Sequence, residues 1–222
     1  FRIIIAKIKH VYNLKSKLIY LFKRIIIVEG DKNMIHPIKH FKTITHHRHL
    51  VIKYSFYCGI FWQGLRHDLS KYSPREFNTG AKYYSGVRSP NSIEIEKIGY
   101  SLSWLHHKGR NKHHFEYWTV YSKVEKKYVP IKMPLNYVKE MLCDRIAATV
   151  VYNGKNYKDY MPLEYFETRN DSYGMHEDTA KLIRIWLTWV KDLGWKEALK
   201  KVKKVKELSL IHISEPTRLQ LI

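Results

Sequence analysis

The chain is poor in cysteine, in acidic residues and in long apolar runs. Its only cysteines among 222 residues are Cys58 and Cys143, too few for a disulfide scaffold or for a zinc site built from four thiolates. No apolar run reaches the ~20 residues that a bilayer-spanning helix needs, and Lys23 and Arg24 interrupt the longest stretch near the start. We therefore expect a cytoplasmic protein without a transmembrane segment, in which any metal ion is held by histidine and carboxylate.

Acidic residues are half as frequent as basic ones. The chain has 40 Lys and Arg against 20 Asp and Glu, a formal net charge of +20. Such a charge attracts phosphate, nucleic acid or anionic lipid without selecting among them. Hydrophobic residues make up 45% of the chain and aromatic residues 14%, which is enough to build a packed core and excludes a disordered protein.

Both ends of the chain look foreign to a folded domain. Residues 208–222 resemble the translation of a sequencing-library adapter, and sequence of that origin takes no part in a fold. The chain starts at Phe1, and the codons before Met34 could form a purine-rich ribosome site. We expect residues 1–33 to be an untranslated leader or, alternatively, a basic N-terminal extension. The domain is then expected over residues 34–207.

Helix start and stop signals recur within the expected domain, whereas strict alternation of apolar and polar residues does not. We therefore predict an all-α, single-domain helical bundle. The longer helices are expected at residues 42–61, 92–108, 134–151, 176–193 and 195–207.

Two of these helical segments make specific packing predictions. Segment 92–108 carries an apolar face at helical spacing, formed by Ile95, Ile98, Leu102 and Leu105. Segment 134–151 carries a second such face, formed by Val138, Leu142, Cys143, Ile146 and Val150. Between the first two helices, Ser73, Pro74 and Glu76 combine an N-cap, a proline at the first helical position and a capping-box glutamate, so a further helix should start there.

Histidine is concentrated in the middle of the chain, where eight of the 13 lie between His46 and His114. Within this region His67 and Asp68 supply an imidazole and a carboxylate, the ligands that borderline divalent metals favour. Adjacent residues do not share a helix face, so the pair can converge on an ion only at an irregular turn. Asp144 falls on the otherwise apolar stripe of helix 134–151, and a buried carboxylate needs a partner. These residues are candidate metal ligands.

Three local patterns resemble the histidine-aspartate (HD) superfamily of metal-dependent phosphohydrolases. They are His47 followed at helical spacing by Val51, Leu65-x-His67-Asp68-Leu-x-Lys71, and Cys143-Asp144-Arg145-Ile-Ala. The resemblance covers about residues 42–152 and implies an HD-like helical domain that holds a divalent ion (Mn, Ni, Co, Fe, Zn or Mg). The implied ligands are His47, His67, Asp68 and Asp144. His46 and His49 compete with His47 for the first position, and the spacing to Val51 favours His47.

A wider stretch, from residue 34 to about residue 193, resembles an uncharacterised family of bacterial and phage proteins. Its marks in this chain are HDLSKYSP, WLHHKGRNKHHFEYW and CDRIAA. This closer resemblance supplies no known reaction, so the function rests on the HD resemblance and on the residues themselves.

A second ion is a further possibility. Its candidate ligands are His106, His107, His113 and His114, with Asp68 bridging the two ions. The HD resemblance then implies hydrolysis of a nucleotide or a small phosphorylated metabolite by metal-activated water. Candidates for binding the substrate phosphate are Lys71, Lys108, Arg110 and Lys112, of which Arg110 is best suited to a bidentate grip. The expected catalytic residues are His67, Asp68, Lys71 and Arg110.

The basic segment 104–118 also supports an alternative from another class of protein. It interleaves cations with Trp104, Phe115, Tyr117 and Trp118, and a nucleic-acid platform uses cations for phosphates and rings for bases. The alternative is a non-catalytic helical protein that binds nucleic acid through this segment. A third interpretation gives the histidines a purely structural ion.

Overall fold

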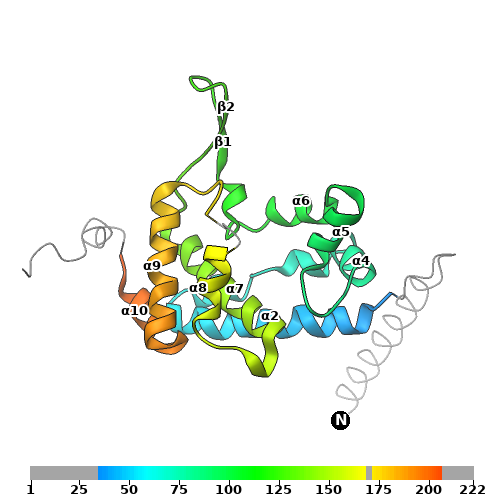
Figure 1. Cartoon of the computed structure of the whole chain (residues 1–222), viewed down its shortest axis with the longest axis horizontal. Coiled ribbons are helices and arrows are strands. Elements are labelled where there is room, and N and C mark those ends of the chain that lie inside the picture. Colours follow the sequence, from blue (N-terminus) through cyan, green and yellow to red (C-terminus); the bar gives the residue numbers. More distant parts are fainter. Residues whose placement is uncertain (1–34, 169–171, 207–222) are drawn as a thin grey trace, which may run out of the picture. The chain divides into compact units, whose positions relative to one another are not determined.

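The computed structural model describes residues 35–168 and 172–206 (Figure 1). The expected leader or extension at residues 1–33 and the expected adapter at residues 208–222 lie outside the described residues, so the structure does not bear on either expectation. The described residues from His36 onward belong to one compact unit.

The described residues are mostly helical, and the all-α prediction is confirmed. The helices are α2 (Pro37–Cys58), α3 (Phe61–Gly64), α4 (Pro74–Lys82), α5 (Pro90–Ile98), α6 (Leu102–Lys108), α7 (Leu135–Asn153), α8 (Met161–Thr168), α9 (Glu177–Leu193) and α10 (Trp195–Lys204). Short 3-10 turns lie at η1 (Leu69–Tyr72), η2 (Phe115–Tyr117) and η3 (Gly154–Asn156). One antiparallel hairpin, β1 (Thr119–Ser122) and β2 (Lys127–Pro130), forms the only sheet in the part of the chain that the structure describes.

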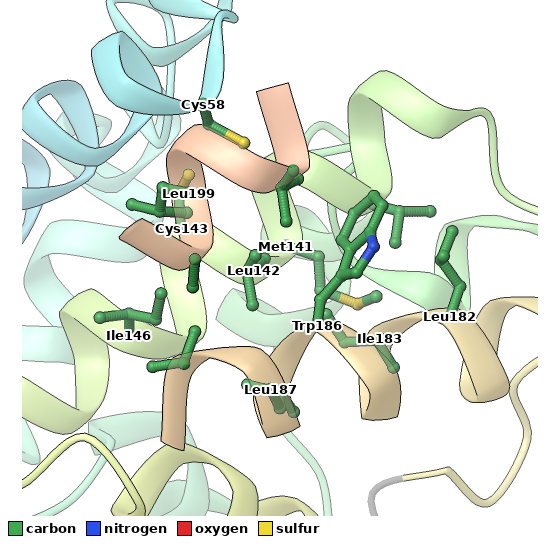
Figure 2. Packing of buried hydrophobic residues seen from close by; sticks show 14 of the residues in the cluster. Cys58, Met141, Leu142, Cys143, Ile146, Leu182, Ile183, Trp186, Leu187 and Leu199 are labelled. Atoms are coloured by element: carbon green, nitrogen blue, oxygen red, sulfur yellow. The ribbon is translucent and has the colours of Figure 1, made fainter. Parts of the chain in front are cut away.

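The core lies where α2, α7, α9 and α10 meet. Helix α7 contacts both α2 and α9, and α10 contacts the same two helices. Figure 2 shows Leu142 and Cys143 of α7, Trp186 of α9 and Leu199 of α10 gathered in this core, and all four side chains are fully buried. The apolar stripe predicted for segment 134–151 is therefore confirmed, except that Val150 is only half-buried. This packing fixes the position of α7.

Helix α2 starts earlier and ends earlier than the predicted 42–61. Pro37 occupies the first turn, where its missing N–H leaves no helical hydrogen bond unmade. The helix stops because Gly59 adopts a left-handed conformation with φ 80°, which glycine reaches without a Cβ penalty. The buried face of α2 runs through Ile44, His47 and Val51, so the first candidate ligand lies on the face that packs into the domain.

The prediction of one helix at residues 92–108 is wrong. Gly99, with φ 83°, ends α5, and the side chain of Ser101 accepts the backbone N–H of Trp104 to cap the start of α6. A glycine stop followed by a serine cap separates the two helices.

The break also overturns the predicted packing of this segment. The side chains expected to be buried are exposed by 42 to 56%: Ile95, Ile98, Leu102 and Leu105. The polar side of the segment is buried instead, where Ser103 donates a hydrogen bond of 2.9 Å to Glu94. The same reorientation buries His107 near the end of α6.

Candidate metal centre

Four separate parts of the chain bring histidines and carboxylates to one buried place. Helix α2 supplies His47, and the turn between α3 and η1 supplies His67 and Asp68. The end of α6 and the loop after it supply three further histidines, His107, His113 and His114. Helix α7 supplies Glu140 and Asp144, which lie one helical turn apart. Three groups of these residues could hold a metal ion.

The first group consists of the four ligands that the HD resemblance implies: His47, His67, Asp68 and Asp144. One ligand atom from each lies within 4.8 Å of the others. His47 Nε2 is 2.9 Å from Asp144 Oδ1, and His67 Nε2 is 3.2 Å from Asp68 Oδ2. The two competitors of His47, His46 and His49, are exposed. The structure thus brings the predicted set together and leaves the competing histidines at the surface.

The second group joins Asp68 to three histidines of the following loop. His107 Nε2 lies 3.4 Å from Asp68 Oδ1, and His113 Nε2 lies 3.6 Å from the same oxygen. His114 Nε2 is 2.9 Å from His107 Nε2. Asp68 belongs to both groups and turns a different oxygen toward each. This is the arrangement expected of a carboxylate that bridges two ions.

His106 points elsewhere. Its Nδ1 lies 2.6 Å from Glu76 Oε1, and the residue is in none of the three groups. Of the adjacent pair, His107 therefore faces the centre.

The backbone at Asp68 explains how two adjacent residues reach one centre. Asp68 has φ 53° and ψ 26°, in the left-handed region, where a residue other than glycine pays about 1 kcal/mol. This conformation departs from a helix, in which successive side chains point in different directions, and it lets both His67 and Asp68 face inward. Arg48 of α2 holds the turn by donating hydrogen bonds to the carbonyls of Leu65 and His67.

Two carboxylates that sequence reasoning missed orient the histidines. Glu140 Oε1 lies 2.9 Å from His67 Nδ1 and 3.3 Å from His113 Nδ1, and Glu76 Oε2 lies 2.7 Å from His107 Nδ1. A carboxylate can only accept here, so each Nδ1 carries a proton and each Nε2 lone pair faces the centre. Histidines that bind metals are commonly oriented in this way.

A signal for each missed carboxylate is present in the sequence. Glu140 precedes Asp144 by one turn on a predicted helix, which places the two acids on one face. Glu76 was interpreted as a capping-box residue, but Ser73 makes no side-chain cap hydrogen bond and Glu76 turns to the histidines instead. The capping-box prediction is therefore wrong, although α4 does start at Pro74.

The carboxylates of the centre are held in their ionised form. Burial alone would raise the pKa of Asp68, but His67 and Lys71 outweigh it and hold that pKa well below its usual value. Burial is likewise outweighed at Asp144, whose hydrogen bonds with His47 and His67 lower its pKa. At Glu140, hydrogen bonds from His113 and His67 overcome burial and lower the pKa to about 2. The centre is therefore rich in negative charge.

The histidines divide according to their surroundings. Burial lowers the pKa of His47 and His114, so both are neutral imidazoles with a free lone pair near pH 7. Burial would also lower the pKa of His67, but Asp68 and Asp144 raise it well above its usual value in the metal-free protein. The ammonium of Lys71, 2.6 Å from Asp68 Oδ2, offsets part of the negative charge. The rest calls for protons on imidazoles or for a divalent cation.

Several polar atoms of the centre are buried without a hydrogen-bond partner among the described residues. They include His67 Nε2, His113 Nε2 and Asp68 Oδ1. Buried polar atoms normally find a partner, because leaving one unmade costs about 1–3 kcal/mol. Their chemistry, imidazole nitrogen and carboxylate oxygen, is that of ligands for a transition metal or zinc. The donor set thus fits a metal ion.

The candidate phosphate-binding residues lie at different depths. Lys71 is in the centre, where its side chain is 29% exposed. Lys108 is half-buried, while Arg110 and Lys112 are exposed. Arg110 contacts only the backbone carbonyl of His106, at 3.5 Å, and the Nζ of Lys112 lies 5.6 Å from the ring centroid of Tyr117. Of the four, only Lys71 contacts a carboxylate of the centre.

Fold and site together define a helical protein with a buried histidine-carboxylate centre. Residues 36–188 match the family described as "Family of unknown function (DUF5662)", and the chain belongs to that family. The matched region contains the three sequence marks noted above, HDLSKYSP, WLHHKGRNKHHFEYW and CDRIAA. No curated protein and no solved structure is significantly similar to the chain. Within the described residues, every helix is too short or too polar to cross a bilayer.

Proposed function

We propose that the protein is a metal-dependent phosphohydrolase of the HD type, acting on a phosphoester. The observation that carries the proposal is the convergence of buried imidazole nitrogens and carboxylate oxygens, several of them without a hydrogen-bond partner, from four separate segments. His47, His67, Asp68 and Asp144 are the proposed ligands of one ion. This set agrees with the pattern His, His-Asp, Asp that the sequence shares with the HD superfamily.

A second ion is proposed between Asp68 and the three histidines of the loop, His107, His113 and His114. The nitrogen-rich donor set favours Zn, Mn, Fe, Co or Ni over Mg, which prefers oxygen ligands. When bound, divalent ions of this kind lower the pKa of a coordinated water and polarise a phosphoryl oxygen.

The protein's own residues have separate parts in this reaction. Glu140 and Glu76 hold protons on the Nδ1 atoms of the histidines and so keep the Nε2 atoms directed inward. Lys71 is placed to neutralise the phosphate because its ammonium already contacts Asp68 and is partly exposed. Arg110 and Lys112, which lie at the surface, would act on the substrate outside the buried centre.

The experiment measures metal content and hydrolysis together. The full chain, Asp68→Ala and Asp144→Ala are purified, and bound metals are counted by inductively coupled plasma mass spectrometry. Hydrolysis of p-nitrophenyl phosphate, bis(p-nitrophenyl) phosphate and a panel of nucleotides is then measured with added Mn, Co, Ni, Fe or Zn. The proposal expects stoichiometric metal and hydrolysis in the wild type and loss of both in the two variants. His46→Ala and His49→Ala, exposed on the helix that carries His47, are the matched controls.

The alternative, a non-catalytic nucleic-acid-binding protein, relies on segment 104–118. Three of its histidines turn into the buried centre, so they are not available to contact bases or phosphates. The alternative would be supported if the protein bound nucleic acid but carried no stoichiometric metal. A purely structural ion would be supported if melting depended on metal while hydrolysis was absent with every substrate.

A further inference from the structure

The β1–β2 hairpin has no part in the buried centre. It projects away from the helices (Figure 1), and most of its side chains are exposed. Val124, at its turn, is 93% exposed, and Tyr128 is 73% exposed. A two-stranded hairpin is at best marginally stable by itself in water, and exposed apolar side chains at its turn contribute nothing to the core. Packing therefore does not account for these side chains.

The hairpin starts and ends beside the segments that build the centre. Strand β1 follows closely after His113 and His114, and β2 leads into α7 with Glu140 and Asp144. Its base is closed by a hydrogen bond of 2.8 Å from Ile131 N–H to the carbonyl of Trp118. The indole of Trp118 in turn donates to the carbonyl of Lys112, at 2.7 Å. The hairpin is thus attached firmly to the loop that carries the histidines.

The segment from residue 108 to residue 127 has the charge of a polyanion-binding surface. Its six basic residues are Lys108, Arg110, Lys112, Lys123, Lys126 and Lys127, against two acidic residues, Glu116 and Glu125. Lys127 pairs with Glu125 at 2.9 Å. Lys123 and Lys126 are also exposed at the turn. The excess positive charge is complementary to a phosphate backbone.

Exposed aromatic rings lie between these cations. Tyr117 is 39% exposed, Tyr121 is 55% exposed, and Tyr128 faces Tyr121 across the hairpin with 5.5 Å between ring centroids. Cations that follow a backbone and rings that stack on successive bases are the two components of single-strand binding sites. Bases in a duplex are already stacked on one another, so exposed rings favour an unpaired strand.

We propose that the hairpin is an arm that binds single-stranded nucleic acid, and that the substrate class of the adjoining centre is therefore a polynucleotide. The part that concerns hydrolysis rests on the function proposed above, whereas the binding part does not. Lys123 and Lys126 contact phosphates, and Tyr121 and Tyr128 stack on bases.

The test measures binding of the full chain to a fluorescein-labelled single-stranded DNA oligonucleotide by fluorescence anisotropy over a series of salt concentrations. One variant removes the turn charges, Lys123→Ala with Lys126→Ala. A second removes the rings, Tyr121→Ala with Tyr128→Ala. The matched controls remove equal numbers of exposed lysines and tyrosines elsewhere in the described residues: Lys191→Ala with Lys204→Ala, and Tyr100→Ala with Tyr173→Ala.

We expect the wild type to bind with a steep salt dependence. Loss of two phosphate contacts should reduce the slope of log affinity against log salt by about 1.4 for a single strand. Loss of the rings should weaken binding by about tenfold or more and leave the slope unchanged. A wild type that does not bind, or hairpin variants that bind no more weakly than their controls, would overturn the inference. Tighter capture of the wild type by phosphatidylserine vesicles than by the oligonucleotide would also overturn it.

Hydrolysis of bis(p-nitrophenyl) phosphate by the same variants separates this inference from the proposed function. The hairpin variants should cleave this small diester at the wild-type rate and cleave the oligonucleotide more slowly. If the wild type binds the oligonucleotide but cleaves neither compound with any metal, the proposed function fails and the binding arm stands. If the wild type cleaves both and the hairpin variants cleave the oligonucleotide at the wild-type rate, the arm fails and the proposed function stands.

Discussion

The Nε2 atoms of His107 and His114 face each other at 2.9 Å in the interior of the protein. His107 donates its Nδ1 proton to Glu76, which leaves a lone pair on its Nε2. Burial, reinforced by the neighbouring His113 and His107, holds the pKa of His114 well below its usual value. Two neutral imidazoles at this distance either share one proton or direct both lone pairs at a common cation. The pair therefore has the chemistry of a metal site.

Replacing Glu140 by glutamine tests whether this carboxylate orients the histidines. The change keeps the size of the side chain but removes the negative acceptor for His67 Nδ1 and His113 Nδ1. We expect metal affinity to fall by about 10- to 100-fold, measured by competition with a chelating dye. Glu164→Gln, at an exposed position of α8, is the control. Equal affinities in the two variants would show that Glu140 has no orienting role.

Lys71→Gln should separate metal binding from turnover. The Lys71 ammonium lies 2.6 Å from Asp68 Oδ2, where its positive charge opposes that of a metal ion on the same carboxylate. Its removal should therefore leave metal affinity unchanged or tighter, while kcat for phosphoester hydrolysis falls. The measurement combines metal titration with steady-state kinetics. A loss of metal in this variant would assign Lys71 a structural role instead.

Gly64 permits the close approach of α3 to α2 that positions the His67-Asp68 turn. A Cβ at Gly64 would lie 2.4 Å from the Cβ of Ser55, so Gly64→Ala should cost about 1–3 kcal/mol by overpacking. Urea denaturation measures this loss. In Ser55→Gly with Gly64→Ala the conflicting Cβ is gone, so the double variant should be more stable than the sum of the single changes predicts. Strict additivity would contradict the account.

His40 should make the fold sensitive to acid. Burial, with a further contribution from Lys71, lowers the pKa of His40 from 6.5 to about 4. The unfolded chain therefore takes up a proton at higher pH than the folded protein. The stability associated with neutral His40 is present above pH 6.5 and is lost as the pH falls toward 4, by about 3 kcal/mol in total.

The measurement is the free energy of unfolding in urea between pH 7.5 and pH 4.5, with a chelator present. His40→Gln may not titrate at this position, so it should show a shallower dependence on pH than the wild type whatever its stability at pH 7.5. Parallel curves for the two proteins would contradict the assigned burial effect.

The sequence predicted the parts of the site that lie on regular elements. His47 and Asp144 were predictable because helical spacing places them on the buried faces of α2 and α7. The adjacency of His67 and Asp68 indicated an irregular turn, and the left-handed backbone at Asp68 provides one. The orienting role of Glu76 could not be predicted from local sequence. It depends on α4 packing against α6, where a contact distant in sequence replaces a local cap.

Two features of the fold escaped the pattern analysis for physical reasons. The apolar spacing of 92–108 suggested one helix, but the backbone preferences of Gly99 and Ser101 prevailed and divided it. The β1–β2 hairpin is exposed on both faces, so it carries no alternation of apolar and polar residues from which strands could be predicted.

The most direct test of the central claim is an anomalous diffraction experiment on crystals of the full chain grown with manganese or zinc. The account predicts an anomalous peak among His47, His67, Asp68 and Asp144, and the second ion predicts another peak beside Asp68 and the loop histidines. A protein whose crystals show metal only at surface histidines, with none bound to Asp68, would contradict it.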